Sequence, residues 1–230
     1  MHAEDKDIIS FVNETCNSDS KVLEIGGGSG ALLDLIESNS SVTKLYNCDF
    51  VPETYQFQAN PNINLIGCTA LNLPFQDQTF DYCIAKNLLH HLVGSTQNES
   101  KLNAAKAVEE LIRVVKNEGF VIILEQYNKC NLCTTLLFHA TLLFSHMGIS
   151  SKFFGMGKNV IVSFLTPGEI QNLLCGQNSR ITKISLLKNI NNDATIALRF
   201  KLSLLMSKVG VALLIARIDK SERQSDALSF

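Results

Sequence analysis

The stretch Lys21–Ala31 reads K-V-L-E-I-G-G-G-S-G-A, and it organises the rest of the chain. Its first half is apolar and suits a buried strand, whereas residues 26–30 include four glycines that let the backbone turn sharply and approach a ligand. An apolar segment with helical spacing follows at residues 31–36. The stretch therefore predicts a strand, a tight turn and a helix whose first amides face a ligand.

Two classes of cofactor fit this turn. Gly26, Gly28 and Ala31 occupy the small-residue positions of the loose dinucleotide-binding pattern Gly-x-Gly-x-x-Gly/Ala. Glu24 lies two residues before the first glycine, where its charge would repel a pyrophosphate but attract a cation. The carboxylate thus favours a cofactor that carries a positive charge.

The pattern Glu24-x-Gly26-x-Gly28-x-Gly30 resembles the first motif of S-adenosylmethionine-dependent methyltransferases of the Rossmann-like class, whose cofactor carries an ammonium and a sulfonium. A second run, A-L-N-L-P-F-Q-D-Q-T-F-D at residues 70–81, precedes L-H-H-L at residues 89–92. Together these runs resemble the large methyltransferase family that includes the ubiquinone and menaquinone biosynthesis C-methyltransferases. That family usually has an Asp before the alanine to meet the adenine amino group, and this chain departs from the pattern with Thr69.

Asp49 follows Gly30 by about twenty residues, where βαβ nucleotide sites place the acid that binds the ribose hydroxyls. The alternative is that Asp49 caps a helix begun by Pro52. The resemblance implies that S-adenosyl-L-methionine is the cofactor. The cofactor contacts expected on these grounds are Glu24, Gly26, Gly27, Gly28, Gly30, Asp49, Phe50, Thr69, Ala70, Lys86 and Asn87.

Length and spacing favour a single α/β domain of 230 residues, a doubly wound, mostly parallel Rossmann-like sheet. Residues 1–20 would be a lead-in helix, 21–128 the cofactor core, 129–165 an apolar lid insert, 166–220 a C-terminal helix with strands, and 221–230 a tail. The family resemblance implies a final antiparallel strand. Strands are expected at 22–25, 42–48, 63–66, 82–85, 120–124, 181–187 and 211–218, and helices at 7–16, 31–37, 100–116, 130–147, 166–174 and 195–208.

The acceptor side is expected at the carboxyl ends of the strands, which is where open α/β sheets bind ligands. His90 and His91 follow the fourth strand and are the candidate catalytic bases, with a packing or capping role as the alternative for each. Glu125 and Tyr127 are expected at the end of the fifth strand, outside the core. The uncharged, Leu- and Phe-rich insert predicts a mobile lid over a small, hydrophobic acceptor, and its named residues are Phe138, Phe144, Phe153, Phe154 and Met156.

Charge and cysteine content limit which partners and which cellular compartment are expected. The net charge is −2 and no run of Lys or Arg occurs, which predicts that no nucleic acid is bound. The insert is too diluted with polar residues for a spanning helix, although contact with a membrane surface stays open. Seven cysteines, an odd number, and an N-terminus without a secretory pattern favour a reducing cytoplasm. Cys130-x-x-Cys133 has no second ligand pair at metal spacing, so no metal is expected.

Two other functions compete with methyl transfer. An oxidoreductase of the NAD type would explain the glycines and Asp49, but it leaves Glu24 unexplained. The pair Tyr82-x-x-x-Lys86 imitates the catalytic pair of short-chain dehydrogenases, yet it lies in a run of strand composition. Four residues of strand span about 13 Å, so that pair cannot meet over one substrate. The third possibility is a cofactor-binding module without catalysis.

Overall fold

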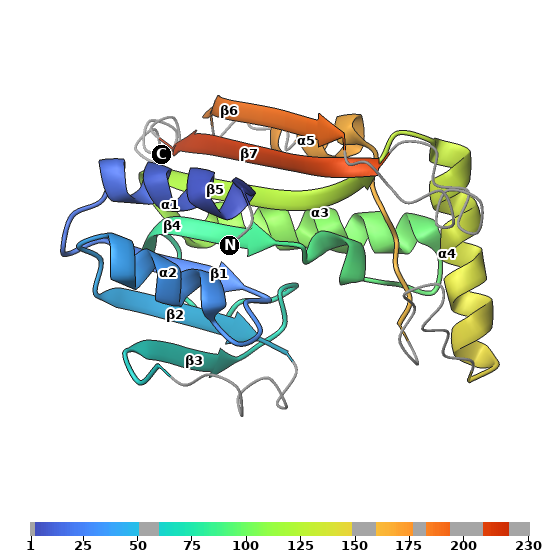
Figure 1. The fold of residues 1–230 in the computed structure, drawn as a ribbon, viewed down its shortest axis with the longest axis horizontal. Helices are drawn as coiled ribbons and strands as arrows, with labels where there is room; N and C mark the ends of the chain where they lie inside the picture. The colour runs from blue at the N-terminus through green and yellow to red at the C-terminus, as the bar shows by residue number, and fades with distance from the viewer. Residues whose placement is uncertain (1–2, 51–59, 149–159, 177–182, 194–208, 221–230) are drawn as a thin grey trace, which may run out of the picture.

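The computed structural model describes residues 3–50, 60–148, 160–176, 183–193 and 209–220. One sheet runs through these ranges in the strand order β3-β2-β1-β4-β5-β7-β6 (Figure 1). Its pairings are parallel, except that β7 is antiparallel to both β5 and β6. The strands are β1 (Lys21–Ile25), β2 (Lys44–Asp49), β3 (Ile63–Gly67), β4 (Phe80–Lys86), β5 (Val115–Asn128), β6 (Lys183–Asp193) and β7 (Val209–Asp219). This confirms the Rossmann-like sheet with an antiparallel strand near its edge.

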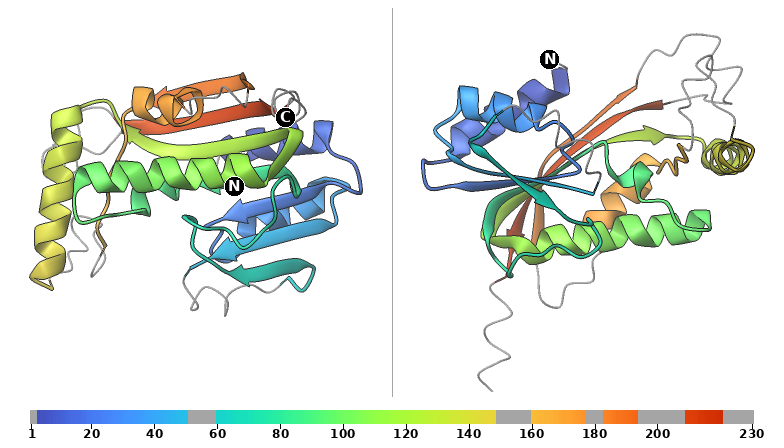
Figure 2. Two further views of the ribbon diagram at one scale, coloured as in Figure 1. Left: turned by 180° about the vertical axis from the view of Figure 1, so that it is seen from behind. Right: turned by 90° about the horizontal axis from the view of Figure 1, so that it is seen from below.

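Helices cover both faces of the sheet (Figure 2). Helices α1 (Ala3–Thr15) and α2 (Ala31–Asn39) lie on one face, and α3 (Gln97–Val114) and α5 (Pro167–Cys175) lie on the other. Helix α4 (Asn131–His146) stands across the end of the sheet toward which the parallel strands point. A 3-10 turn, η2 (Leu89–His91), follows β4 at that same end.

Strand alternation divides the interior into two cores. In β1, Val22 packs with the α1 and α2 side, whereas Leu23 and Ile25 pack with the α3 and α5 side. Glu24 shares the face of Val22 because successive side chains point to opposite faces of a strand. The glycine turn after Ile25 therefore begins with a carboxylate on the α1 and α2 face.

The long helix and the fifth strand meet earlier than their sequence pattern predicts. The pattern extends the helix to residue 116 and begins the strand at Phe120, but α3 ends at Val114 and β5 begins at Val115. Val115 already pairs with Phe80 of β4, and the ladder then shifts register before Tyr82 pairs with Phe120. β5 consequently spans 14 residues and continues to Asn128.

The C-terminal helix begins as predicted. Thr166 caps α5 in a capping box with Glu169, and Pro167 is the first helical residue. Some of the predictions fall on residues that the structure does not describe. These are the expected helix at 195–208, the helix after Pro52, the tail, and Phe153, Phe154 and Met156. In the ranges the structure describes, no helix is both long and apolar enough to cross a membrane.

Candidate functional site

A cavity of about 570 Å³ opens at the carboxyl ends of β1, β2 and β4. Its volume is in the range of roughly 300–1,000 Å³ that is typical of small-molecule sites. β1 lies between β2 and β4, so the strand order reverses here, and open α/β sheets bind ligands at such a point. The lining residues are Gly26, Cys48, Asp49, Phe50, Cys68, Thr69, Ala70, Leu71, Asn87, Leu88, His91, Leu92, Val93 and Asn103.

The glycine turn forms one wall of this cavity. Gly26, Gly28 and Gly30 have φ values of +66°, +54° and +77°, a region that side chains rarely adopt. A Cβ on Gly26 would lie 2.6 Å from Leu88, whereas a Cβ on Gly28 would meet nothing within 4 Å. The first glycine is therefore needed for packing, and the backbone at the second is open to a ligand.

Residues of β2 hold the turn in place. The backbone amide of Gly28 donates to Asp49 Oδ2 at 2.9 Å, and Asn47 Nδ2 donates to the carbonyl oxygen of Gly28 at 2.9 Å. The amide of Gly26 donates to the carbonyl oxygen of Cys48 at 2.7 Å. Asp49 thus lines the cavity, as predicted, and also fixes the glycine turn. No sequence motif pointed to Asn47, because it supports the turn from within a strand.

Two buried oxygen atoms beside the turn have no hydrogen-bond donor among the described residues: Glu24 Oε2 and Asn87 Oδ1. Glu24 is 3% exposed, and burial raises the pKa of its carboxyl to about 8, although the nearby charge of Lys86 acts in the opposite direction. Native proteins rarely leave buried acceptors unsatisfied. These two oxygen atoms suit a cationic donor such as an ammonium group. A cationic ligand is also what the position of Glu24 in the sequence predicts.

Gly27 and Lys86 contact the protein itself. A Cβ on Gly27 would lie 2.9 Å from Glu24 Oε2, so a glycine is needed to make room for that carboxylate. Lys86 Nζ lies 2.6 Å from Asp5 Oδ1, and Asp5 belongs to α1 and is 4% exposed. Lys86 is predicted to contact the cofactor, and in the structure it ties the end of β4 to the lead-in helix without lining the cavity. Asp5 was missed because nothing in its local sequence indicates burial.

The other end of the cavity is flanked by residues that follow β2 and β3. Phe50 is 77% exposed and lines the cavity, which leaves its ring available to a flat ligand. Thr69 and Ala70 line the facing side, and Thr69 Oγ1 accepts from the amide of Leu71 at 3.3 Å. These three predicted residues therefore lie together, as the sequence pattern requires.

The sulfur atoms of Cys48 and Cys68 are in bonding contact at the edge of this cavity, as a disulfide, and their Cα atoms are 5.8 Å apart. A second disulfide joins Cys130 and Cys133 at the beginning of α4. Cys48 is 2% exposed and also packs in the core on the α3 and α5 side of the sheet.

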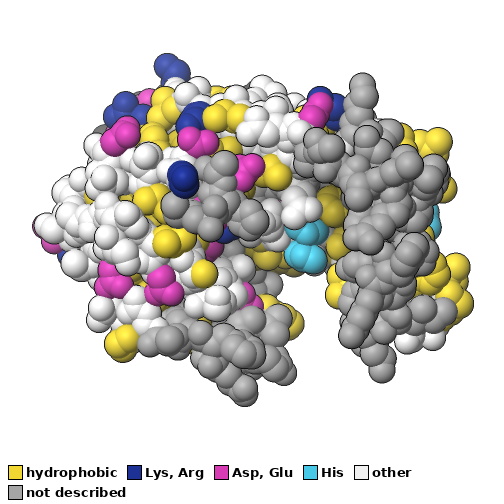
Figure 3. All heavy atoms as spheres, viewed as in Figure 1, with side chains coloured by type: hydrophobic (Ala, Val, Ile, Leu, Met, Phe, Trp, Pro, Cys, Tyr) yellow, Lys and Arg dark blue, Asp and Glu magenta, His cyan; other side chains and the backbone are white. Residues whose placement is uncertain are grey.

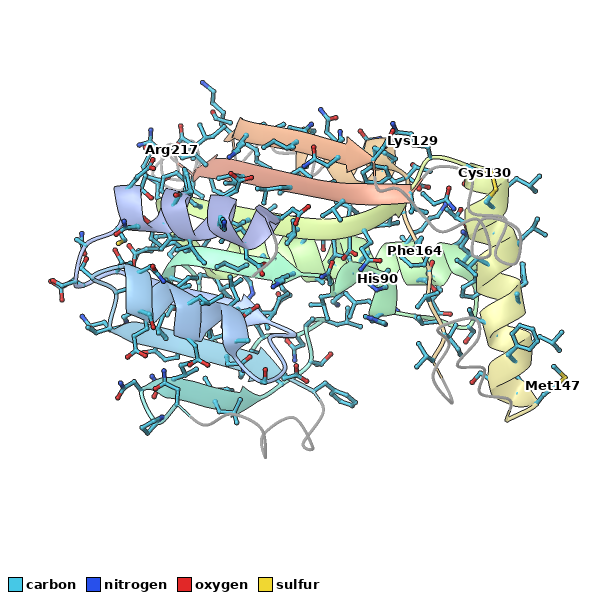
Figure 4. The ribbon with its side chains drawn as sticks, viewed as in Figure 1. His90, Lys129, Cys130, Met147, Phe164 and Arg217 are labelled. Atoms are coloured by element: carbon cyan, nitrogen blue, oxygen red, sulfur yellow. A yellow bond between two sulfur atoms is a disulfide. The ribbon has the colours of Figure 1, made fainter. Side chains whose placement is uncertain are left out.

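The two adjacent histidines have different surroundings. His91 lines the cavity, while His90 is buried behind it and stacks on Phe164 with ring centroids 5.0 Å apart (Figure 4). His90 Nδ1 donates to Glu125 Oε1 at 2.5 Å, and the amide of Leu89 donates to Glu125 Oε2 at 2.6 Å. Burial lowers the pKa of His91 below its usual 6.5, and the neighbouring His90 lowers it further. His91 is thus a neutral imidazole that faces the cavity.

The expected positions of the acceptor residues need correction. Glu125 and Tyr127 are both fully buried, because β5 continues past them, and Tyr127 donates to Asp193 Oδ1 of β6 at 2.6 Å. Phe138 is also fully buried, and Phe144 is half-buried. None of the four lines the cavity. The residues that do face it beside His91 are Leu88, Leu92, Val93 and Asn103, which the sequence reasoning did not single out.

Histidine side chains lie beside a hollow in the surface of the body of the molecule (Figure 3). One side of α4 is apolar and exposed, and it comprises Leu132, Leu136, Leu143 and Met147. The other side is buried and includes Leu137 and Phe138.

Comparison with known proteins identifies the cofactor core. Residues 23–123 match the methyltransferase domain family. A tRNA (carboxymethyluridine(34)-5-O)-methyltransferase of Arabidopsis thaliana is 36% identical over 110 residues, which are 48% of this chain and 25% of that protein. A probable tRNA methyltransferase 9B of Mus musculus is 32% identical over 114 residues, 48% of this chain and 23% of that protein. The chain thus spans about a quarter of the length of these relatives.

Solved structures agree on the fold. The YcgJ protein of Bacillus subtilis superposes with a TM-score of 0.64 at 18% identity, covering 95% of this chain and 99% of that one. A geranyl diphosphate C-methyltransferase of Streptomyces coelicolor, solved with S-adenosyl-L-homocysteine, gives a TM-score of 0.62 at 9% identity, covering 94% and 80%.

These relatives also correct one prediction. The absence of Lys and Arg runs was taken to exclude a nucleic-acid partner, and that exclusion is wrong, because proteins named as tRNA methyltransferases share about half of this chain. Overall charge was therefore the wrong criterion for excluding a nucleic-acid partner. The match is to the methyltransferase domain in general and does not single out the ubiquinone and menaquinone enzymes. Residues 23–123 thus match the methyltransferase domain family, and the Rossmann-like sheet around the glycine turn has the fold of a methyltransferase solved with S-adenosyl-L-homocysteine.

Proposed function

We propose that this protein transfers the methyl group of S-adenosylmethionine to a small, largely apolar acceptor that enters the cavity beside His91. The observation that carries the proposal is the composition of the wall around that imidazole, where Leu88, Leu92 and Val93 are apolar and His91 and Asn103 are polar. Such a wall buries the hydrocarbon part of an acceptor and leaves few polar groups to orient its reactive atom.

The cofactor fits the residues at the glycine turn. Glu24 and Asn87 would accept from its ammonium, since each has a buried oxygen without a donor in the described residues. Asp49 would accept from the ribose hydroxyls, and Phe50 would cover the adenine ring. When bound, the cofactor supplies a methyl carbon that its sulfonium has already activated.

The protein's contribution is then chiefly alignment. Holding two reactants in a productive geometry lowers a barrier by up to about 7–11 kcal/mol, whereas a general base adds about 10²–10⁴-fold. The apolar wall would orient the acceptor, and neutral His91 would take the proton from an acceptor hydroxyl, amine or acidic C–H. His90 and Glu125 would position His91 from behind without touching the acceptor.

The apolar side of α4 supports the same acceptor class. Leu132, Leu136 and Leu143 are 68%, 43% and 57% exposed, and exposed leucines in a row favour an apolar contact. We propose that the chain is a single domain in which residues 129–165 form the acceptor side. We also propose that it works in a reducing, cytoplasmic compartment. Phe144, half-buried on the same helix, would then contact the acceptor, whereas Phe138 packs within the protein.

A second candidate acceptor is a tRNA nucleoside. It is favoured by the two relatives named as tRNA methyltransferases, one of which by its name methylates an oxygen of carboxymethyluridine. A carboxylate acceptor has no proton to lose, so methyl transfer to it would not require His91 as a base. The role of His91 therefore separates the two candidates.

The first prediction concerns the acceptor. Purified protein with labelled S-adenosylmethionine should methylate members of a panel of lipophilic alcohols, phenols and amines, and bulk tRNA is assayed beside them as the second candidate acceptor. The incorporated label is counted after organic extraction and after acid precipitation of the RNA. Label in the RNA alone would reject the small apolar acceptor and establish the second candidate.

The second prediction concerns His91. His91→Ala should lower kcat by about 10²–10⁴-fold on an acceptor that must lose a proton, with little change in cofactor affinity. Because burial depresses its pKa, wild-type kcat should be constant above about pH 6.5 and fall at more acid pH, as the imidazole is protonated. Glu14→Ala, an exposed residue of α1, is the control. Unchanged kcat in His91→Ala would remove the base from the mechanism.

The third prediction concerns Asp49. Asp49→Ala should weaken cofactor binding by one to two orders of magnitude, since hydrogen bonds to a charged group contribute about 1.5–3 kcal/mol. The amide of Gly28 also loses its acceptor in this variant. Calorimetric titration with S-adenosylhomocysteine measures the effect, and Asp19→Ala, an exposed acid, is the control. Equal affinities for wild type and Asp49→Ala would contradict the assignment.

The fourth prediction concerns Glu24 and pH. Its pKa is about 8 in the folded, ligand-free protein and 4.5 as a free side chain, so the folded state holds a proton that the unfolded state has released. The contribution of Glu24 to the free energy of unfolding should therefore fall as pH rises from about 5 to 8. Glu24→Gln should flatten this decline in urea titrations, whereas exposed Glu109→Gln should retain it. A decline that persists unchanged in Glu24→Gln would assign it to another group.

A further inference from the structure

We propose that Cys48 and Cys68 form a reversible redox modification site in the wall of the cofactor cavity, so that the thiol state of the protein sets its affinity for S-adenosylmethionine. The inference rests on the cofactor assigned above and not on the identity of the acceptor.

The backbone already holds the two cysteines at bonding distance. Cys48 precedes Asp49 at the end of β2, and Cys68 directly follows β3, with its amide donating to the carbonyl oxygen of Asp49 at 3.0 Å. Parallel pairing sets Asp49 opposite Gly67, which fixes the register at this point. Their Cα separation of 5.8 Å is within the range of about 4.4–6.8 Å for disulfides. The bond can therefore form and break without rearrangement of the sheet.

The two thiols differ in access. Cys48 is 2% exposed, whereas Cys68 is half-buried and lines the cavity beside Thr69. A small disulfide such as glutathione disulfide can reach Cys68 first. Cys16, Cys83 and Cys175 are free, and burial raises the pKa of the Cys83 thiol well above its usual range, which keeps that thiol unreactive.

The exchange is balanced without any other reactant. The Cys68 thiolate attacks one sulfur of glutathione disulfide, forms a mixed disulfide and releases one glutathione thiolate, which takes up the proton that Cys68 lost. The Cys48 thiolate then attacks the sulfur of Cys68, expels the second glutathione and closes the protein disulfide. Two protein thiols are oxidised and one small disulfide is reduced to two thiols.

The bond would act on the part of the cavity that holds the adenosine. It joins the ends of β2 and β3, and the next residues along the chain are Asp49 and Phe50 on one side and Thr69 and Ala70 on the other. A cross-link there holds both walls in the binding geometry before the ligand arrives, which favours binding. By linkage, bound ligand must favour the disulfide by the same factor.

The test uses the full chain with Cys130→Ser and Cys133→Ser, so that the other pair cannot exchange. The protein is equilibrated at graded ratios of reduced to oxidised glutathione, and the Cys48–Cys68 bond is quantified by differential alkylation and mass spectrometry. Calorimetry with S-adenosylhomocysteine then gives the affinity of each state. The disulfide form should bind at least about fivefold more tightly, and the ligand should shift the glutathione midpoint toward the disulfide by the same factor.

Variants separate this effect from general oxidation. Cys48→Ser and Cys68→Ser should each bind with one affinity at every glutathione ratio, and Cys16→Ser should behave as the parent protein does. A bond that does not form, or equal affinity in both states, would overturn the proposal and leave the proposed methyl transfer intact. Failure of every methyl acceptor would leave this proposal standing, because no step of the test requires turnover.

Discussion

The cavity wall beside His91 depends on one buried carboxylate. Glu125 is fully buried near the end of β5, and its two oxygens accept from the amide of Leu89 and from His90 Nδ1. A buried charge is costly unless its partners stay in place, so η2 cannot leave β5 without exposing or stranding that carboxylate. The amide of Ser163 donates to the carbonyl oxygen of His90, which ties a third segment to the same point. This constraint is what puts His91 on the cavity wall.

The cofactor side uses a buried carboxylate in the opposite way. Glu24 Oε2 has no donor among the residues that the structure describes, and burial raises its pKa to about 8, whereas both oxygens of Glu125 are satisfied by the protein. Glu125 therefore stabilises contacts that the protein itself completes. Glu24 leaves one oxygen to be satisfied by a cationic ligand. A perturbed, buried acid beside a cavity is the pattern expected of a functional site.

Local patterns explain why much of the fold could be predicted. The glycine turn, the buried apolar strand β1 and the start of α5 each depend on neighbours in the sequence, and each was predicted correctly. The burial of Glu125 could not be read in this way, because it depends on the pairing of β5 with β7 and on a bridge from Tyr127 to Leu165. The Lys86–Asp5 pair likewise joins segments far apart in the chain, so the spacing of motifs could not reveal it.

The same distinction between local and long-range contacts bears on the acceptor. The methyltransferase match ends at residue 123, just before Glu125, and the match therefore contains the glycine turn, Asp49 and both histidines. Phe164, which stacks on His90, and the apolar side of α4 lie beyond it. The matched segment contains the proposed cofactor contacts, whereas the groups that pack behind η2, Glu125 and Phe164, lie outside it. Likeness within that segment is therefore evidence for the cofactor, and acceptor choice has to be sought in the contacts that the later part of the chain makes with His90 and His91.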